Sequence, residues 1–517
     1  MNPNISKATS RPLGVAQKLV KHAVNEADVY SKVVVLTGES EAISTENGRW
    51  CFLDALALLS RVVGNLVVVL PECPSKFENE VRDYCSQAWR LGSLQVVRGD
   101  IRQFPTTTHA VLCIGAKAGL APLWTVINSN GWVARVSSGV SSLPSDFDQP
   151  NALGALMAAS LGVTEIFKRI YCVPHDIAPL LDKTEFSLFD LTTSPSRIGP
   201  PIPNEINLPD TLLVGAGAIG NGIALLMSQM PFRGRVHVID KQDYADENLG
   251  TCVLLSHSSW LKHPKASRLA SWLRENSLLD VTGEKALIES AKAGETIPNL
   301  AIDLVLNGLD DSGARREAQK MWPAILIDGG INEIGAAVVQ HRLNAEDLAC
   351  MQCWFEPPKV DERVQQSSLT GLDIASLSNL DRLLTEDDIE MAAEDKREWL
   401  RKNAREGKTV CSIITEAALS AKLGVDVDEG FRPSVPFVAT TAAALVVSEA
   451  VKALLFPDEP VVSKFQIDSL FLGPEKSSMK LRMLPLSHCH CVIHRELINR
   501  LHAKRQKNTS KLEVEST

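Results

Sequence analysis

A glycine-rich loop in the middle of the chain is the first candidate for chemistry. Gly215, Gly217 and Gly220 follow the apolar run 212–214 and open a stretch of helical character. Asp240 ends the next apolar run. Small residues let the backbone approach phosphates at a helix N-terminus, and a carboxylate at the end of the second strand can hold a ribose. The pattern predicts a nucleotide-binding βαβ unit, although the glycines alone are also typical of dehydrogenases.

Four further polar residues follow this unit in an order that suits work on a triphosphate. Asn248 and Lys265 come first, and Asp310 and Arg315 come after a second buried-type run at 303–307. Attack on an α-phosphate requires cations and hydrogen-bond donors around the pyrophosphate, and a carboxylate that holds Mg²⁺. The set supplies all of these groups, for which a nicotinamide dehydrogenase has no use.

The order of these motifs resembles the adenylating domain of the superfamily that includes ThiF, MoeB and the ubiquitin-activating enzymes. The resemblance covers most of the chain and implies that ATP binds over the glycine loop together with Mg²⁺. It assigns Asp240 to the ribose of ATP, and Asn248 and Lys265 to its phosphates. It assigns Asp310 to the Mg²⁺ and ATP site, and it gives Asp310 and Lys265 catalytic roles.

Two positions depart from the family pattern. Thr251 replaces the phosphate arginine that follows Asn-Leu in the family, and Gln242 replaces the second acid of its Asp-x-Asp motif. Arg315, Lys262 or an arginine from the first half of the chain would have to compensate. Arg11, ahead of the first apolar run, is the candidate from the first half, and a surface arginine in a loose terminus is the alternative interpretation.

Two close pairs of cysteines lie far apart in the sequence. Cys350 and Cys353 form a Cys-x-x-Cys, and Cys489 and Cys491 stand near the end beside His488. Four such ligands bind Zn²⁺ in a tetrahedron, and a site with four protein ligands is structural. A lone Cys-x-x-Cys is also typical of redox pairs, but the second pair and its placement in ThiF and MoeB proteins favour zinc. We expect the four cysteines as ligands, with His488 and Cys491 as the alternative second pair.

Cys411 lies between these pairs, within a polar insert of helical character at 357–432. Ubiquitin-activating enzymes have their catalytic cysteine at this place, ahead of a helix whose pattern is matched here by 436–444. The resemblance implies that Cys411 attacks an acyl-adenylate and holds the acyl group as a thioester. The alternative is a buried cysteine in an apolar helix.

The elements that position these residues belong to a duplicated α/β architecture. Residues 158–168 match residues 442–452 at six of eleven positions, and each segment closes a stretch of alternating strands and helices. Such alternation predicts parallel sheets with helices on both faces. In the first copy, the turn after the first strand carries Glu39 and Glu41, whose carboxylates would repel phosphate. We therefore expect this copy to be inactive, like the silent half of ubiquitin-activating enzymes.

The predicted fold is thus α/β, with two Rossmann-like, ThiF-type adenylation domains, a helical catalytic-cysteine insert and a zinc clip. Because the silent domain is fused to the active one, a monomer is sufficient, and a homodimer stays possible. The predicted divisions are an inactive domain at 1–195, a linker at 196–207, the two parts of the active domain at 208–356 and 433–494, the insert at 357–432 and a flexible tail at 495–517.

Composition favours a cytoplasmic protein. The 517 residues are 45% hydrophobic, and the net charge of −9 argues against a general nucleic-acid binder. No apolar run is long enough to cross a membrane, and the polar N-terminus lacks a signal core. Cysteines in such a chain are expected as metal ligands, nucleophiles or core thiols rather than disulfides. The expected core thiols are Cys51, Cys73, Cys85, Cys113, Cys172 and Cys252.

The expected function is activation of a small ubiquitin-like protein, whose C-terminal carboxylate is adenylated, transferred to Cys411 and passed to a conjugating enzyme. Few residues follow the last cysteine pair, so no ubiquitin-fold recruitment domain is expected. This compactness resembles bacterial Bil-type conjugation systems of antiphage defence. Two alternatives stay open: a ThiF/MoeB-like adenylyltransferase of a sulfur carrier that forms no thioester, and a catalytically silent scaffold.

Overall fold

The computed structural model describes residues 3–20, 24–87, 90–99, 107–117, 123–255, 258–288, 302–309, 312–343, 347–356, 360–404, 407–423 and 434–515. Within these ranges the chain forms two eight-stranded sheets with equivalent strand orders. In each sheet the first five strands are parallel, and each of the last three runs antiparallel to its neighbour. The same order in both sheets agrees with the repeat found in the sequence.

The strands have the following spatial order. The first sheet contains β3 (Ser93–Arg98), β2 (Asn65–Leu70), β1 (Val33–Gly38), β4 (Thr108–Ile114), β5 (Trp124–Asn130), β6 (Val133–Ser137), β7 (Thr184–Ser187) and β8 (Thr192–Thr193). The second sheet contains β13 (Asp280–Glu284), β12 (Arg235–Ile239), β10 (Thr211–Val214), β14 (Leu304–Asn307), β15 (Ile325–Ile331), β16 (Ala336–Arg342), β17 (Lys464–Ile467) and β18 (Ser478–Leu481). A separate pair is formed by β9 (Ile206–Asn207) and β11 (Phe232–Arg233).

Helices connect and cover these strands. Those of the first half are α1 (Pro3–Val20), α2 (Glu26–Ser31), α3 (Ser40–Ile43), α4 (Glu46–Val62), α5 (Ser75–Gln87) and α6 (Ala152–Ile170). Those of the second half are α7 (Ala218–Gln229), η1 (Asp246–Asn248), η2 (Ser258–Trp260), α8 (Lys265–Asn276), α9 (Ser312–Gln319), α10 (Met351–Trp354), α15 (Pro436–Leu455), α16 (Pro474–Ser477), α17 (His490–Ile493) and α18 (Arg495–Glu515).

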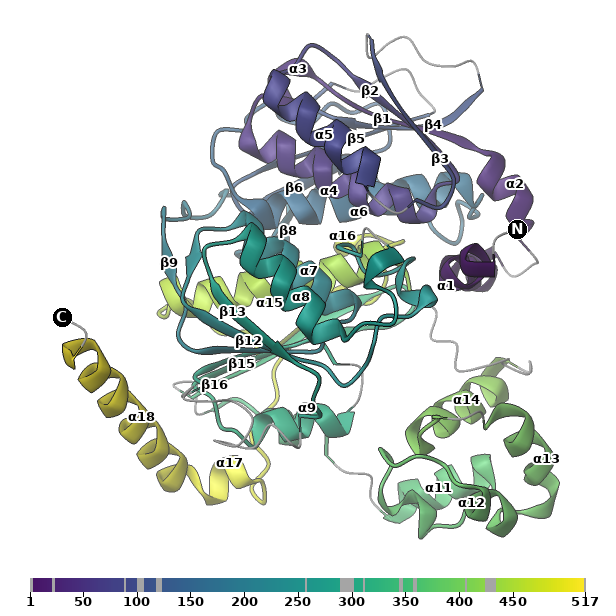
Figure 1. Cartoon of the computed structure of the whole chain (residues 1–517), viewed down its shortest axis with the longest axis vertical. Helices are drawn as coiled ribbons and strands as arrows, with labels where there is room; N and C mark the ends of the chain where they lie inside the picture. Colours follow the sequence, from purple (N-terminus) through teal and green to yellow (C-terminus); the bar gives the residue numbers. More distant parts are fainter. Residues whose placement is uncertain are drawn as a thin grey trace.

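Helices α4, α6, α7 and α15 lie between the two sheets and join them into one hydrophobic core (Figure 1). Helix α6 packs on α4, and α15 packs on both α6 and α7. Helix α15 is long and apolar enough to cross a membrane by length and composition alone, but 83% of its apolar window is buried in the protein. Its apolar character is therefore explained by its place between two sheets.

The duplicated helices exchange hydrogen bonds across the boundary between the halves. Lys168 on α6 donates to the carbonyl oxygen of Phe471 at 3.0 Å, and Lys452 on α15 donates to that of Phe189 at 3.1 Å. Both ammonium groups are buried, and each forms an ion pair with a glutamate three residues earlier in its helix. Each half thus supplies acceptors that the other half's lysine requires.

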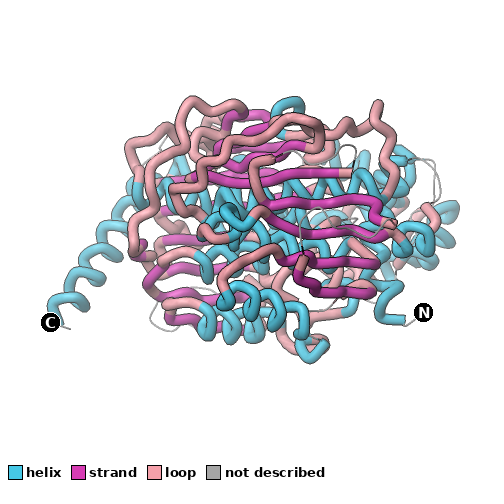
Figure 2. The backbone as a smooth tube through the Cα atoms, turned by 90° about the horizontal axis from the view of Figure 1, so that it is seen from above, coloured by secondary structure: helices cyan, strands magenta, loops and turns pink. Residues whose placement is uncertain are grey.

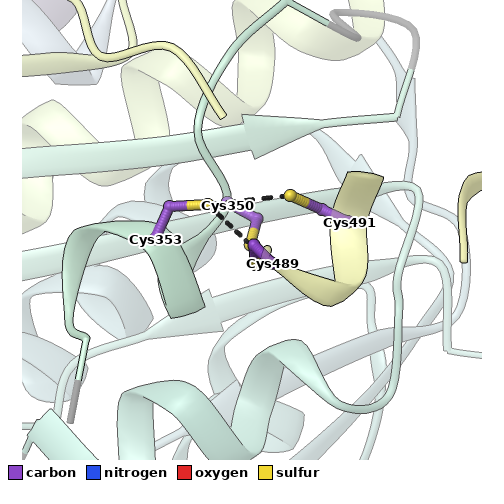
Figure 3. Close-up of side chains that lie close together, drawn as sticks. All are labelled: Cys350, Cys353, Cys489 and Cys491. Carbon is purple, nitrogen blue, oxygen red and sulfur yellow. Dashed lines mark hydrogen bonds between the residues drawn. The ribbon is translucent and has the colours of Figure 1, made fainter. Parts of the chain in front are cut away.

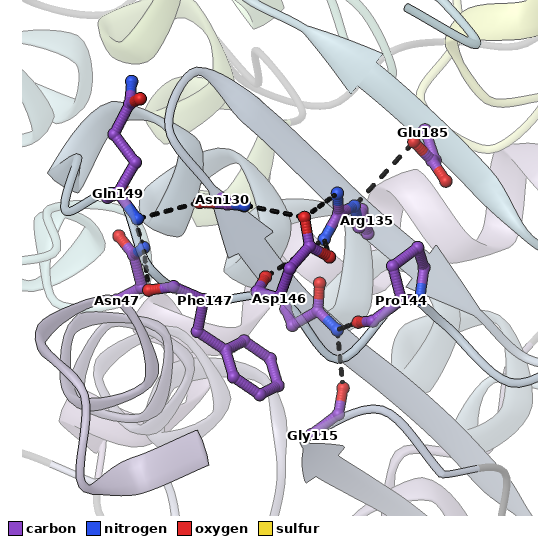
Figure 4. Close-up of polar contacts among 10 residues, drawn as sticks. Asn47, Gly115, Asn130, Arg135, Pro144, Asp146, Phe147, Gln149 and Glu185 are labelled. Carbon is purple, nitrogen blue, oxygen red and sulfur yellow. Dashed lines mark hydrogen bonds and ion pairs between the residues drawn. The ribbon is translucent and has the colours of Figure 1, made fainter. Parts of the chain in front are cut away.

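The halves differ in the connection that leads to this last helix. In the first half, residues 138–151 join β6 to α6, and side chains hold the segment closed (Figure 4). Arg135 pairs with Asp146 at 2.7 Å, and Asn130 donates to the same carboxylate at 2.7 Å. In the second half, residues 343–435 make the equivalent connection and contain the predicted insert.

This insert is helical, as predicted, and has a core of its own. Its helices are α11 (Val360–Thr370), η3 (Ser376–Ser378), α12 (Glu386–Met391), α13 (Glu394–Asn403) and α14 (Val410–Leu423). Figure 1 shows this unit set apart from the two sheets. The buried residues of its core are Leu372, Leu377, Ile389, Ala392, Leu400, Val410 and Ile413.

The C-terminal segment is helical within the described residues. Of the predicted flexible tail at 495–517, residues 495–515 form helix α18, which extends away from the body (Figures 1 and 2). Ile498 and His502 are buried near its start, and Arg505 donates to the carbonyl oxygen of Trp322 at 2.8 Å. The start of the helix is thus held by one apolar side chain together with an arginine and a histidine.

The expectation of core thiols is wrong at one position. Cys51, Cys85, Cys113 and Cys252 are buried, but Cys73 is half-buried and Cys172 is exposed. Cys172 follows the end of α6 with a φ of 51°, where the chain turns away from the core. Lys32 donates to its sulfur at 3.2 Å.

Replacement of Lys168 by methionine tests the exchange between the halves. The change leaves Glu165 buried without its cation and two carbonyl groups without a donor, so we expect the free energy of unfolding to fall by about 3 to 5 kcal/mol. Urea denaturation measures this free energy of unfolding. Lys76→Met on exposed α5 is the matched control and should have little effect. A Lys168→Met protein as stable as the control would contradict the assignment.

Candidate nucleotide site and cysteine centre

The predicted glycine loop connects β10 to α7 at the carboxyl edge of the second sheet. Gly215 has a φ of +89°, and a Cβ on Gly220 would clash with the carbonyl oxygen of Gly215. A Cβ on Gly217 would meet no atom within 4 Å. The positive φ explains glycine at 215 and the nearby Gly215 carbonyl explains glycine at 220, whereas the backbone at Gly217 is open to the approach of a ligand.

Asp240 ties this loop to the end of β12. Its carboxylate accepts hydrogen bonds from the amides of Ala216 and Gln242, both at 2.8 Å. The side chain is 9% exposed, and each carboxylate oxygen has a second lone pair. Asp240 can therefore fix the loop and still accept from a ribose hydroxyl.

Two residues that the sequence did not suggest also hold the loop. Asn221 donates to the carbonyl oxygens of Ala216 and Gly217, both at 2.9 Å, and to the Tyr244 hydroxyl at 3.1 Å. Both Asn221 and Tyr244 are buried. The only signal was an asparagine in an otherwise apolar helix, which is also compatible with a simple cap.

Lys265 and Asn248 lie buried in neighbouring elements of the second half. Lys265 is the first residue of α8, and its ammonium donates to the side-chain oxygen of Gln242 at 2.7 Å. Asn248, at the end of η1, accepts from the amide of Ala245 at 2.9 Å. Gln242 stands where the family has a second acid, so the charge of Lys265 has no carboxylate partner among the ion pairs of the described residues.

Helix α1 of the first half, which carries Arg11, lies beside η1 of the second half. Helix α1 packs against η1, and Lys18 on α1 forms an ion pair with Glu333 of the second half at 2.6 Å. Arg11 on this helix lies close enough to Cys252 to act on its thiol. Burial raises the pKa of Cys252, and the charges of Lys265, Arg11 and Arg61 oppose that rise. Arg11 is half-buried on a helix, and its role as a phosphate ligand stays a prediction.

Arg315 has a different environment from the one expected for a phosphate ligand. Its guanidinium donates to the carbonyl oxygen of Leu309 at 2.7 Å, lies 3.3 Å from Asp328 and stacks over Phe355. Burial raises the pKa of Asp328 to about 7, although the charge of Arg315 acts against this shift. Arg315 and Asp328 thus support the loop that leads to Asp310, which lies outside the described residues.

In the first half, the turn after β1 carries a glutamate. Glu39 follows β1 and accepts hydrogen bonds from the amides of Ala116 at 3.2 Å and Lys117 at 2.9 Å. A cavity of about 720 Å³ adjoins it. The negative charge disfavours a nucleotide there. The carboxylates that line the cavity are those of Glu39, Glu41, Glu72 and Glu78.

The four predicted metal ligands come together at the end of the second half (Figure 3). All four sulfur atoms lie within 4.8 Å of one another. The sulfur of Cys350 is 3.6 Å from that of Cys489, and the sulfur of Cys353 is 3.6 Å from that of Cys491. Zinc–sulfur bonds of about 2.3 Å give tetrahedral edges of about 3.8 Å. The buried thiols therefore fit Zn²⁺.

His488 does not belong to this cluster. Its ring nitrogen lies 2.7 Å from the carboxylate of Glu356, and its side chain is 67% exposed. The geometry thus favours Cys489 and Cys491 as the second pair over His488 and Cys491.

Cys411 lies in the first turn of α14, where the amides of Val410, Ser412 and Ile413 already donate to Arg382 and Thr409. The side chain is half-buried, and its backbone amide donates to the carbonyl oxygen of Leu380 at 2.8 Å. Both residues belong to the helical unit that Figure 1 shows apart from α7 and the glycine loop. The structure thus links the glycine loop, Asp240 and Lys265 through Gln242, and it leaves Cys411 separate from them.

Comparison with known proteins gives one family match. The model of the ThiF family matches residues 195–491, more than half of the chain. The uncharacterized protein y4jF of Sinorhizobium fredii is 26% identical over 341 residues, which cover 64% of this chain and 62% of y4jF. The chain thus spans about three fifths of that relative.

Solved structures of MccB from Escherichia coli are also similar. MccB with MccA-N7isoASN matches at a TM-score of 0.36 and 15% identity, over 55% of this chain and 67% of that chain. MccB alone matches at a TM-score of 0.35 and 14% identity, over 54% and 64%.

Metal analysis tests the cysteine centre. We expect about one zinc per chain, and we expect Cys353→Ser to lose it because three thiolates hold the ion weakly. Removal of zinc by a chelator should lower the thermal midpoint by about 5 °C or more. Atomic emission measures the zinc content, and calorimetry measures the thermal midpoint. Cys172→Ser, at an exposed cysteine, is the control that should keep the metal. Equal zinc in both variants would rule out this site.

Proposed function

Because this chain belongs to the ThiF family, we propose that it is an ATP-dependent adenylyltransferase acting on the C-terminal carboxylate of a small ubiquitin-like protein. The observation that carries the proposal is the buried Lys265, whose ammonium donates to Gln242 beside Asp240 and the glycine loop, while helix α1, which carries Arg11, packs on η1. Cations fixed around a pyrophosphate stabilise the charge that develops on it in the transition state.

In the first step, a carboxylate oxygen of the substrate attacks the α-phosphorus of ATP. The bond from this phosphorus to the bridging oxygen breaks, and pyrophosphate leaves. Asp240 holds the ribose, Gly217 lets the phosphates approach the backbone, and Asn248, Lys265 and Arg11 bind the phosphates. Mg²⁺ would supply charge neutralisation there, with Asp310 as its ligand.

In the second step, the Cys411 sulfur attacks the acyl carbon of the adenylate. The carbon–sulfur bond forms, the bond to the AMP oxygen breaks, and the thiol proton passes to solvent. The thiol of a conjugating enzyme then takes the acyl group. Since Cys411 belongs to a separate helical unit, this step requires that unit to approach the glycine loop. We place the pathway, by resemblance alone, in bacterial antiphage defence.

A second candidate follows from the same separation. An adenylyltransferase of a sulfur carrier needs the nucleotide site and the zinc centre but no thioester on Cys411. The position of α14 apart from the glycine loop favours this alternative.

Intact-protein mass spectrometry distinguishes the candidates. The chain is mixed with ATP, Mg²⁺ and a ubiquitin-like protein encoded in the same genomic neighbourhood. We expect an adduct that reductant removes, because a thioester exchanges with thiols. Cys411→Ala should abolish the adduct and keep acyl-AMP formation, whereas Cys172→Ala should keep both.

Each other outcome has a distinct meaning. An adduct that survives in Cys411→Ala would exclude this cysteine as the nucleophile. Acyl-AMP without an adduct would assign the protein to the sulfur-carrier class. A partner that binds without acyl-AMP formation would favour a silent scaffold and direct attention to Thr251.

A further inference from the structure

Arg61 is a buried cation of the first half that contacts the second half. It lies in the last turn of α4, and 1% of its surface is exposed. Its guanidinium donates to the carbonyl oxygen of Ala57 at 2.6 Å and to the hydroxyl of Ser60 at 3.2 Å. It also donates to the carbonyl oxygens of Cys252 at 3.0 Å and Leu255 at 3.1 Å, both in the second half.

Burying the charged guanidinium of Arg61 costs free energy, which polar partners must offset. None of the ion pairs found in the described part of the chain includes Arg61, so only carbonyl and hydroxyl dipoles compensate it. The C-terminal end of α4 helps, because the helix dipole is negative there. A planar guanidinium holds two carbonyl groups of one loop in a fixed geometry, which the single nitrogen of a lysine ammonium does not reproduce.

The loop that Arg61 holds is the one that departs from the family pattern. Thr251 stands where the family has its phosphate arginine, and no other arginine follows in 252–255. The amides of Thr251 and Cys252 donate to the carbonyl oxygen of Asn248 at 3.1 and 2.8 Å. Arg61 therefore holds the backbone of Cys252, and the amide of Cys252 holds the carbonyl group of Asn248.

We propose that Arg61 is a positioning residue supplied by the silent half, which sets the phosphate-binding segment of the active half through the Cys252 and Leu255 carbonyl groups. It acts through Asn248 and touches no nucleotide itself. The assignment rests on the proposed function, because it concerns the geometry of the same ATP site. It gives the silent half a role in catalysis that is separate from the direct contribution of Arg11.

Direct titration of the full chain with ATP and Mg²⁺ tests the assignment without a protein partner. We expect Arg61→Met and Arg61→Lys to raise the Kd for ATP by about 10-fold to 100-fold, because a small displacement of binding groups has effects of this size. Arg61→Lys keeps the charge at the end of α4 and serves if the methionine variant does not fold. Hydrogen exchange of amides in 248–255 should increase in both.

Arg135→Met is the matched control, since Arg135 is a buried arginine of the same half whose contacts stay within that half. This variant should lower stability and leave the Kd for ATP unchanged. An Arg61→Lys protein that binds ATP as tightly as the wild type would overturn this assignment and leave the proposed function standing. A wild-type chain that binds no ATP would overturn the proposed function, and the assignment with it.

Discussion

Two buried lysines place the strongest constraint on this molecule. Lys168 and Lys452 occupy equivalent positions of the duplicated helices α6 and α15, and each donates to a carbonyl group of the opposite half. A buried ammonium must be paired and hydrogen-bonded, and in both lysines the opposite half supplies one of the acceptors. The hydroxyls of Ser160 and Thr440 meet at 2.7 Å between the same helices. Neither half can therefore bury its last helix as well alone as it does in the pair.

The nucleotide site depends on this arrangement because part of it comes from the first half. With α6 fixed against α15, helix α1 reaches η1 and Arg61 reaches the loop 252–255. The first half then contributes cations without needing a nucleotide of its own. Glu39 accepts from the amides that follow β4 in the first half, whereas Gly217 begins a helix at the corresponding turn of the second half. The two halves thus differ at these turns while they share one hydrophobic core.

Local patterns explain which parts of this arrangement could be predicted. The glycine loop, Asp240 and the two cysteine pairs are short motifs whose chemistry depends on neighbours in the sequence, and the repeated helices carried the duplication. Arg61 and Asp328 could not be assigned in this way, because their partners come from distant segments. Their signal was a charge inside an apolar run, which indicates burial but names no partner. The polar α18 was missed for the same reason.

The separation of Cys411 from the glycine loop is compatible with a thioester step only if the insert moves as a unit. Its own core and the hydrogen bond from Cys411 to Leu380 keep α14 attached to the other insert helices during such a movement. One contact would have to break, since the Asp381 carboxylate lies against Gly313 at the start of α9 so closely that a Cβ there would clash with it. The insert is thus held to the second half by a contact at the start of α9, and its own core keeps α14 and the other insert helices together.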